Sequence, residues 1–452
     1  MEGRDRTILR LAVPALATLA IEPLYVLVDT AIVGHLGTVP LAGLALAATV
    51  LNLAFVVFNF LAFGTTARVA FLTGAGDRPG AARFTVQGLW LSVMCGGALA
   101  VVIATSAGPL ATALGGKGAV RDAAITYLRI SALGGPLALI ALVGNGYLRG
   151  VQDTRTPMVI VVAANVVNVV IELLLVYGLH LGVAGSAWGT VIAQALAAAW
   201  FLVVLVPRIA ATHTTLRLLR SELAQLLRFA RHLFVRTASL IGTLTLSTAI
   251  AARVGRTTLA AHHLALQLTI FLALIVDCLA IAAQSLIGTE LGARRPDAAR
   301  AWGQRLLRVG IVIGAALAVV VAALSGVLPH VFSRDPAVQG LGRDALLIVA
   351  AMQIPASAVF VLDGVLIGAS DTRTQQWGNV IAFAVFAPWA GLVLHWGLGI
   401  VAIWCGLAAW MLARLAVNAT RFRGTRWTAV AGRLSSSPSL LLPDTPSPTS
   451  WK

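Results

Sequence analysis

The chain alternates long apolar segments with short polar ones. Windows such as LWLSVMCGGALAVVIATSAG (89–108) and VGIVIGAALAVVVAALSGVL (309–328) contain no charged side chain. About 20 apolar residues are enough for an α-helix to cross a hydrocarbon core of roughly 30 Å. The pattern predicts about twelve spanning helices, near residues 8–34, 41–72, 84–108, 120–148, 156–178, 183–207, 223–252, 258–290, 304–328, 340–368, 376–396 and 399–420.

Composition supports this class. Hydrophobic residues make up 59% of the chain, charged residues 11%, and the mean hydropathy is +0.90. These values are typical of an integral membrane protein, so we predict an all-α fold within the bilayer. The cysteines lie in separate apolar segments, which indicates packing roles and favours neither a disulfide framework nor a metal cluster: Cys95, Cys278 and Cys405.

The net charge of +16 comes from arginines that flank the apolar segments. They gather in alternate connections, as the positive-inside rule describes for cytoplasmic loops. This bias, together with an even number of spans, predicts that both termini face the cytoplasm, and it explains the charge without nucleic-acid binding. The arginines concerned are Arg4, Arg6, Arg10, Arg78, Arg83, Arg149, Arg155, Arg208, Arg217, Arg220, Arg294, Arg295, Arg300, Arg373, Arg421, Arg423 and Arg426.

The two ends of the chain differ in character. Glu2 and Asp5 lie near the start, and no A-x-A site precedes a polar region, so we expect no removable signal peptide. Residues 421–452 end in RLSSSPSLLLPDTPSPTSWK, a segment rich in Ser and Pro. This composition predicts a disordered cytoplasmic tail.

Short motifs recur at one spacing. The tetrapeptide Asp-Thr-Arg-Thr occurs at 153–156 and again at 371–374, an offset of 218 residues. LRLA at Leu9 matches LRFA at Leu227 at the same offset, and RPGAAR at Arg78 matches RPDAAR at Arg295 at 217. The repeats predict two six-helix lobes, residues 1–215 and 216–420. Because six is even, the lobes share one orientation and are related by an axis along the membrane normal, an architecture of secondary transporters.

Polar side chains interrupt three apolar segments of the first half. Glu22 and Asp29 are seven residues apart and share a helix face, and Pro14 and Pro23 can bend that helix. Asn165, Asn168 and Glu172 share a face of the fifth segment, and Thr190 and Gln194 share one of the sixth. A carboxylate inside a membrane is costly and marks a candidate functional site. No Arg or Lys within an apolar stretch of the first half neutralises Asp29 or Glu172, so we expect these groups to hold a proton or a cation.

The second half has acids at other positions. Asp277, Gln284 and Asp363 form a candidate second polar locus, with Arg236 or Arg253 as its partners. Asp153 and Asp371, in the repeated loops, are expected to form turns and salt bridges. His35, His180, His262, His263 and His395 show no ligand spacing, which favours packing or interfacial roles.

Several catalytic motifs are absent from the sequence. ATALGGKG at Ala111 lacks the first Gly and the final Ser or Thr of a Walker A loop. H-E-x-x-H, G-x-S-x-G and Cys/His metal spacings do not occur either. We therefore expect neither ATP-driven transport nor an enzyme, and no cofactor.

Three motifs resemble the multidrug and toxic compound extrusion (MATE) family, most closely its DinF-like branch. They are LVDTAIVGHLG in the first segment and the loop motifs LRGVQDTRTP and LIGASDTRTQ. The resemblance extends to about residue 420 and implies efflux of drugs or cations coupled to H⁺ or Na⁺. It also implies a site in the first lobe that comprises Asp29, Asn145, Asn168 and Thr190, with the bending proline at Pro14. The fifth-helix acid is usually Asp in similar proteins and is Glu172 here, which favours H⁺ over Na⁺.

These features together predict a secondary active antiporter. It would export organic cations or amphipathic toxins by alternating access, as a monomer in the lipid bilayer of a bacterial inner membrane. The alternative is a flippase for lipids or lipid-linked oligosaccharides, which needs a basic cavity. Arg68, Arg236 and Arg253, near the span ends, keep that alternative open.

Overall fold

The computed structural model describes residues 2–429, and nearly all of them are helical. The elements of the first half are α1 (Glu2–Gly34), α2 (Thr38–Val56), the 3₁₀ turn η1 (Val57–Asn59), α3 (Phe60–Gly74), α4 (Arg78–Ala113), α5 (Gly118–Ala132), α6 (Gly135–Gly150), α7 (Arg155–Leu173), the π-helical η2 (Leu174–Gly178) and α8 (Val183–Ala210). Those of the second half are α9 (Arg220–Val254), α10 (Arg256–Gly292), α11 (Pro296–Leu324), α12 (Leu328–Phe332), α13 (Pro336–Gly368), α14 (Thr372–His395) and α15 (Ile400–Arg423).

The predicted spans are present. In the described part of the chain, 11 helices are long and apolar enough to cross a membrane, or up to 12 if α5 and α6 form one bent span. The bend between α5 and α6 is 49°, and the sequence analysis did not predict it. It falls at Gly134, Gly135 and Pro136, where the backbone of α6 packs directly on Gly96 of α4.

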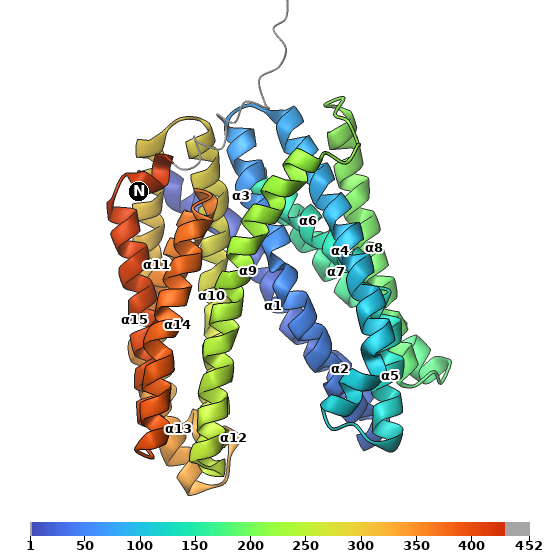
Figure 1. Cartoon of the computed structure of the whole chain (residues 1–452), viewed down its shortest axis with the longest axis vertical. Helices are drawn as coiled ribbons and strands as arrows, with labels where there is room; N and C mark the ends of the chain where they lie inside the picture. Colours follow the sequence, from blue (N-terminus) through green and yellow to red (C-terminus); the bar gives the residue numbers. More distant parts are fainter. Residues whose placement is uncertain (1, 430–452) are drawn as a thin grey trace, which may run out of the picture.

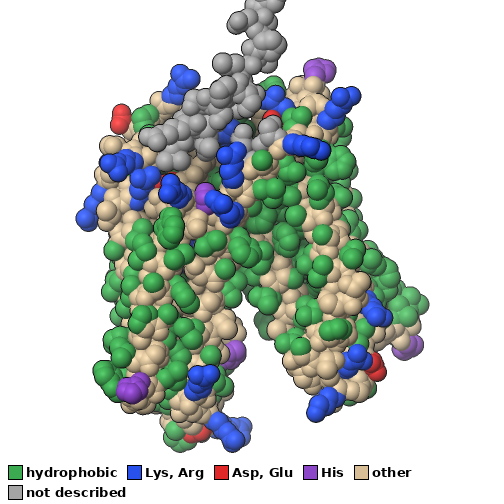
Figure 2. Space-filling view, in the orientation of Figure 1, with side chains coloured by type: hydrophobic (Ala, Val, Ile, Leu, Met, Phe, Trp, Pro, Cys, Tyr) green, Lys and Arg blue, Asp and Glu red, His purple; other side chains and the backbone are tan. Residues whose placement is uncertain are grey.

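The helices form two lobes arranged as a V. The first half of the chain forms one arm and the second half the other, and the arms meet at one end and separate toward the other (Figure 1). The predicted boundary at 215/216 falls in the connection between α8 and α9. A space-filling view shows the molecule hollowed between the arms at the open end (Figure 2).

Helix packing repeats at the spacing seen in the sequence. In the first lobe, Gly146 of α6 packs on the backbone of Ala62 in α3; in the second, Gly364 of α13 packs on Ala280 of α10. Each residue of the second pair lies 218 positions after its counterpart. At both sites a Cβ would collide with the facing helix, so these glycines permit the same close approach twice. The duplication is therefore present in the packing.

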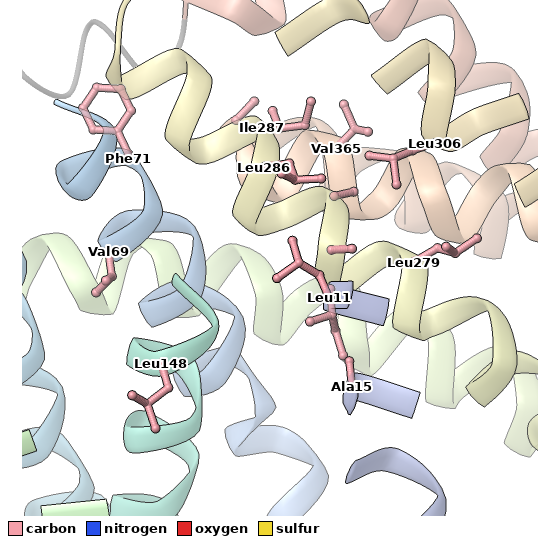
Figure 3. Packing of buried hydrophobic residues seen from close by; sticks show 14 of the residues in the cluster. Leu11, Ala15, Val69, Phe71, Leu148, Leu279, Leu286, Ile287, Leu306 and Val365 are labelled. Atoms are coloured by element: carbon pink, nitrogen blue, oxygen red, sulfur yellow. The ribbon is translucent and has the colours of Figure 1, made fainter. Parts of the chain in front are cut away.

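The lobes join along α3 and α10 near the closed end of the V. Gly74 packs on the backbone of Thr289, and Gly292 packs on the backbone of Phe71. At the 218-residue offset, Gly74 corresponds to Gly292 and Phe71 to Thr289. The two contacts are therefore related by the pseudo-symmetry of the lobes. A hydrophobic core continues through the junction and contains residues of both lobes, among them Val69, Leu148, Leu279, Leu286 and Val365 (Figure 3).

Polar contacts also connect the lobes at this end. Arg305 of α11 forms an ion pair with Asp5 of α1. The Nε2 of Gln152 donates to Thr289 Oγ1 at 3.2 Å, and Arg83 of α4 lies 3.6 Å from Glu222 of α9. The closed end is thus joined by apolar, backbone and ionic contacts.

The C-terminal segment departs from the prediction of a tail that starts at 421. Residues 421–423 complete α15, and Trp427 is fully buried, stacked on Phe422 and donating from Nε1 to the Phe422 carbonyl at 3.0 Å. Burial of the Trp427 side chain in the core therefore orders the described residues that follow α15. The predicted disorder of residues 430–452 lies outside the described residues.

Candidate functional site

Asp29 projects from α1 into the interior of the first lobe. It is 6% exposed although its neighbours on both sides along the helix are exposed. The Ser186 hydroxyl of α8 donates a hydrogen bond to Asp29 Oδ1 at 2.6 Å. Ser186 is itself fully buried, so the carboxylate is held by a neutral donor inside the helix bundle.

Glu172 lies one residue before the end of α7, where the helix passes into the π-helical η2. Its side chain is fully buried, and neither carboxyl oxygen has a hydrogen-bond partner. It is close enough to Asp29 for the two groups to interact electrostatically. Buried polar groups nearly always have a partner, so two orphaned carboxyl oxygens make Glu172 a candidate functional residue.

Asn168 and Gly189 complete this part of the site. Asn168 is one helical turn before Glu172, is 3% exposed, and has an unpartnered Oδ1. Gly189 of α8 faces both: a Cβ there would lie 3.2 Å from Asn168 Oδ1 and 3.2 Å from Glu172 Cβ. Glycine at this position therefore leaves room for the acid and the amide side by side.

Two tyrosines, which the sequence analysis did not select, border the site. Tyr25 of α1 shares a hydrogen bond of 2.9 Å with Thr190 of α8. Tyr127 of α5 is 5% exposed and lies near the Asp29 charge. A phenolic hydroxyl in an apolar span was the signal that could have identified both, because a buried tyrosine needs a polar partner for its hydroxyl.

The electrostatics of this site are unusual. Among the described residues, no Lys, Arg or His forms a salt bridge with Asp29 or Glu172. Two neighbouring carboxylates cannot both keep their charge in a medium of low dielectric constant without a compensating ion. The pair is therefore a candidate site for a proton or a cation.

In the part of the chain that the structure describes, the other polar residues predicted for the first lobe make no hydrogen bond with Asp29 or Glu172. The Oδ1 of Asn145 and the Oε1 of Gln194 are buried without partners. Asn165 donates to the carbonyl of Val161 in its own helix at 2.8 Å. Glu22 is exposed and makes no hydrogen bond within the described chain, so it is separate from the buried pair.

Both prolines of α1 lie inside one continuous helix. Pro14 has no N–H, which leaves the carbonyl of Arg10 without its helical partner. The Thr154 hydroxyl, from the first Asp-Thr-Arg-Thr loop, donates to that carbonyl at 3.4 Å. The loop motif therefore supports the helix at one of its two proline positions, while Pro23 lies closer to Asp29.

The second polar locus has a different composition from the one predicted. Asp363 accepts hydrogen bonds from Arg236 and Arg414, both at 2.7 Å, and from the Asn418 amide at 2.7 Å. Arg236 was predicted as a partner, but Arg414 and Asn418 were missed, and Arg253 is exposed on the surface and takes no part.

The other two residues assigned to this locus lie outside the hydrogen-bonded cluster. Asp277 lies near the guanidinium groups of Arg236 and Arg149, and Gln284 is buried without joining the cluster. Asp363 is thus neutralised within the structure, unlike Asp29. Arg236 is engaged as well, which removes a basic group that the flippase alternative requires.

The repeated loop acids form turns and ion pairs, as predicted. Asp153 accepts from the Thr156 amide at 3.0 Å and lies 3.6 Å from Arg208. Asp371 accepts from Thr374 Oγ1 at 2.9 Å and from Arg421 at 2.5 Å.

Sequence comparisons agree with this architecture. A family model described as MatE matches residues 14–174 and 234–390. The chain is 32% identical over 435 residues to Protein DETOXIFICATION 44, chloroplastic, of Arabidopsis thaliana, covering 93% of this chain and 82% of that protein. It is 30% identical over 431 residues to DNA damage-inducible protein F of Escherichia coli (strain K12), covering 89% and 93%. It is also 30% identical over 428 residues to the probable multidrug resistance protein NorM of Deinococcus radiodurans, covering 89% and 92%.

Solved structures share the fold. A MATE protein in a bent conformation superposes with a TM-score of 0.86 at 21% identity, covering 96% of this chain and 97% of the other. A multidrug resistance MATE family transporter of the MOP superfamily in an outward-facing conformation gives 0.85 at 21% identity, covering 95% and 97%. The duplicated helical bundle, the MatE match across both halves and the relatives together show that this chain belongs to the MATE family of multidrug and toxic compound efflux transporters.

Proposed function

We propose that the protein is an H⁺-coupled antiporter that exports organic cations or amphipathic compounds. The observation that carries the proposal is the buried Asp29–Glu172 pair, which lacks a cationic partner in the described chain. Such a pair can take up a proton when the site opens to one side and release it when the site opens to the other. Relatives named as probable multidrug resistance proteins support export of varied small molecules.

The orientation follows from the distribution of charge. Lys and Arg side chains gather at the closed end of the V, and fewer lie at the tips of the arms (Figure 2). The positive-inside rule assigns the closed end to the cytoplasm. On this basis we propose that the open end faces outward and that both termini are cytoplasmic. We also propose that the protein is a multi-pass monomer of a bacterial inner membrane.

The mechanism uses α1 as the moving element. Protons enter from the open side and neutralise Asp29 and Glu172, which weakens the Ser186–Asp29 hydrogen bond, because a charged acceptor binds a donor more strongly than a neutral one. The α1 helix then bends at Pro14 and Pro23, where its hydrogen-bond ladder is interrupted. Movement of α1 changes the volume of the cavity, and the bound compound leaves as the proton binds.

Protonation is favoured over Na⁺ for two reasons. Asp29 Oδ1 is engaged by Ser186 and Tyr25 by Thr190, so the unpartnered oxygens of the described site are the two of the Glu172 carboxyl group and Asn168 Oδ1, fewer than a metal cation usually binds. Glutamate at 172 also places its carboxyl group one methylene farther along a flexible side chain than aspartate does. A proton needs only one oxygen atom, whereas a metal cation needs several oxygen ligands at once.

Flux measurements in proteoliposomes test this proposal. A fluorescent organic cation is followed under a pH gradient and, separately, under a Na⁺ gradient. We expect movement driven by the pH gradient in the wild type, and loss of that movement in Asp29→Asn although the variant inserts normally. The matched control is Asp122→Asn, which alters an exposed acid on α5 and should transport normally.

Two results would contradict the scheme. Normal pH-driven export by Asp29→Asn would remove Asp29 from coupling. Export driven by Na⁺ and unaffected by the pH gradient would replace H⁺ with Na⁺ at the same site.

A further inference from the structure

Two of the three duplicated motifs each contain one arginine per lobe that the transport scheme does not use. LRLA and LRFA place Arg10 on α1 and Arg228 on α9; the two Asp-Thr-Arg-Thr loops place Arg155 and Arg373 at the starts of α7 and α14. Arg10 and Arg228 are 218 residues apart, as are Arg155 and Arg373. All four side chains are exposed, and none forms a salt bridge with an acid in the described chain.

The fold brings the two arginines of each lobe together where two helices meet. We call this line of contact a seam; it runs between α1 and α7 in the first lobe and between α9 and α14 in the second. In the first lobe, Thr154 donates to the carbonyl of Arg10 at 3.4 Å, and Arg155 is the next residue. The backbones that carry Arg10 and Arg155 therefore adjoin where α1 meets α7. The carbonyl of Arg10 is free for this contact because Pro14 has no N–H to donate to it.

The second lobe builds the same seam by another contact. His232 of α9 replaces the proline, and its Nδ1 lies 3.0 Å from the Thr372 hydroxyl. Arg228 is one helical turn before His232, and Arg373 follows Thr372. Arg231 is exposed beside them, so this seam carries three guanidinium groups. The acid closest in sequence, Asp371, is engaged by Arg421.

Each seam also has exposed apolar side chains next to its arginines. They lie one turn or less from an arginine along the same helices and are between 46% and 59% exposed: Leu9, Val13 and Val159 in the first lobe, and Leu227, Phe234 and Trp377 in the second. All lie on helices that span the membrane. A ligand at the seam would therefore meet positive charge at its head and apolar surface along its body.

We propose that each seam binds the phosphate headgroup of an anionic phospholipid. Two guanidinium groups bind the phosphate oxygens by charge-assisted hydrogen bonds, for which arginine is well suited. The acyl chains lie along the exposed apolar side chains of α1 and α7, or of α9 and α14. Basic pockets between helices at the membrane surface are known to bind such headgroups. The positive-inside rule explains why these residues are basic. It does not explain why they recur in pairs beside exposed apolar side chains.

Native mass spectrometry and a lipid titration of the detergent-solubilised full chain test the proposal. We expect the wild type to retain two molecules of phosphatidylglycerol and to bind this lipid in preference to phosphatidylcholine. Arg228→Gln with Arg373→Gln should lose one molecule, Arg10→Gln with Arg155→Gln the other, and each altered site should bind roughly 30-fold more weakly. Arg294→Gln with Arg295→Gln removes two exposed arginines from the same end of the molecule, outside the seams, and should retain both lipids.

Three outcomes would overturn the proposal. Equal loss of lipid in the Arg294/Arg295 control would show non-specific attraction to positive charge. Equal retention of phosphatidylcholine would show that the arginines do not read the anionic headgroup. Competition by soluble glycerol phosphate at the concentration at which the lipid binds would show a phosphate site that does not need the apolar surface.

Discussion

At the residue scale, the buried acids of the two lobes differ in their polar partners. Asp363 receives two arginines and an asparagine, whereas Asp29 receives one serine hydroxyl and Glu172 no hydrogen bond. A carboxylate that is fully paired with arginines has little tendency to exchange its charge for a proton or cation. The unpaired carboxyl groups are therefore the candidates for the proposed coupling of ion movement to transport.

A glycine controls the geometry of the unpaired acids. In Gly189→Ala the added Cβ would lie 3.2 Å from Asn168 Oδ1 and 3.2 Å from Glu172 Cβ, which is tighter than ordinary contact, so these two side chains must give by a few tenths of an ångström. We expect pH-driven transport to fall several-fold while the protein still inserts and folds. Flux in proteoliposomes measures the change, and Gly97→Ala, where no atom lies within 4 Å of the added Cβ, is the control. Full transport by Gly189→Ala would mean that this packing does not set the site.

At the element scale, the Asp363 cluster joins three helices of the second lobe. Arg236 comes from α9, Asp363 from α13, and Arg414 and Asn418 from α15. α13 is the most deeply buried of the membrane spans in the described chain. The ion pairs therefore connect α9 and α15 to α13.

Loss of this acid should destabilise the fold. In Asp363→Asn the buried guanidinium of Arg414 and the partly buried one of Arg236 lose their counter-charge, and breaking a buried ion pair costs about 3–5 kcal/mol. We expect a clear fall in the thermal unfolding temperature in detergent, measured by intrinsic tryptophan fluorescence. Asp344→Asn, at an exposed position of the same helix, should leave that temperature unchanged. An unfolding temperature equal to that of the wild type would show that the cluster contributes little to stability.

At the scale of the whole molecule, pseudo-symmetry determines how the closed end forms. Ala70 and Gly288 are counterparts 218 residues apart and face each other across the junction of the lobes. The pseudo-twofold axis therefore passes between them, and the Gly74–Thr289 and Gly292–Phe71 contacts lie on either side of it. Alternating access requires these contacts to separate when the molecule opens at this end.

The two glycine contacts should act alike. A Cβ at Gly74 or at Gly292 would collide with the facing backbone, which cannot move aside as a side chain can. We expect Gly74→Ala and Gly292→Ala each to lower the population of molecules in which the two arms are joined at this end. Distances between spin labels at the tips of the two arms should shorten in both variants. Gly391→Ala, which has open space around its Cβ, should keep the wild-type distances, and an effect from only one of the two variants would argue against a symmetric junction.

The membrane class, the span positions and the duplication are predictable from local sequence patterns. Each of these follows from local patterns: an apolar run of bilayer length identifies its own span, and motifs repeated at 218 residues reveal the copy. The spacing along α7 also placed Asn168 and Glu172 on one face, because helical periodicity is a local property. Motif resemblance indicated the family, which the comparisons confirmed.

Which polar residues meet depends on how the helices pack. Ser186 lies 157 positions from Asp29, and Arg414 lies 51 positions from Asp363, so no local pattern connects them. The bend at Gly134–Pro136, the buried Trp427 and the facing glycines of α3 and α10 also depend on neighbours distant in the sequence. Charge compensation in a membrane interior is settled by which helices pack together, and this is why two acids that look alike in the sequence have opposite surroundings in the fold.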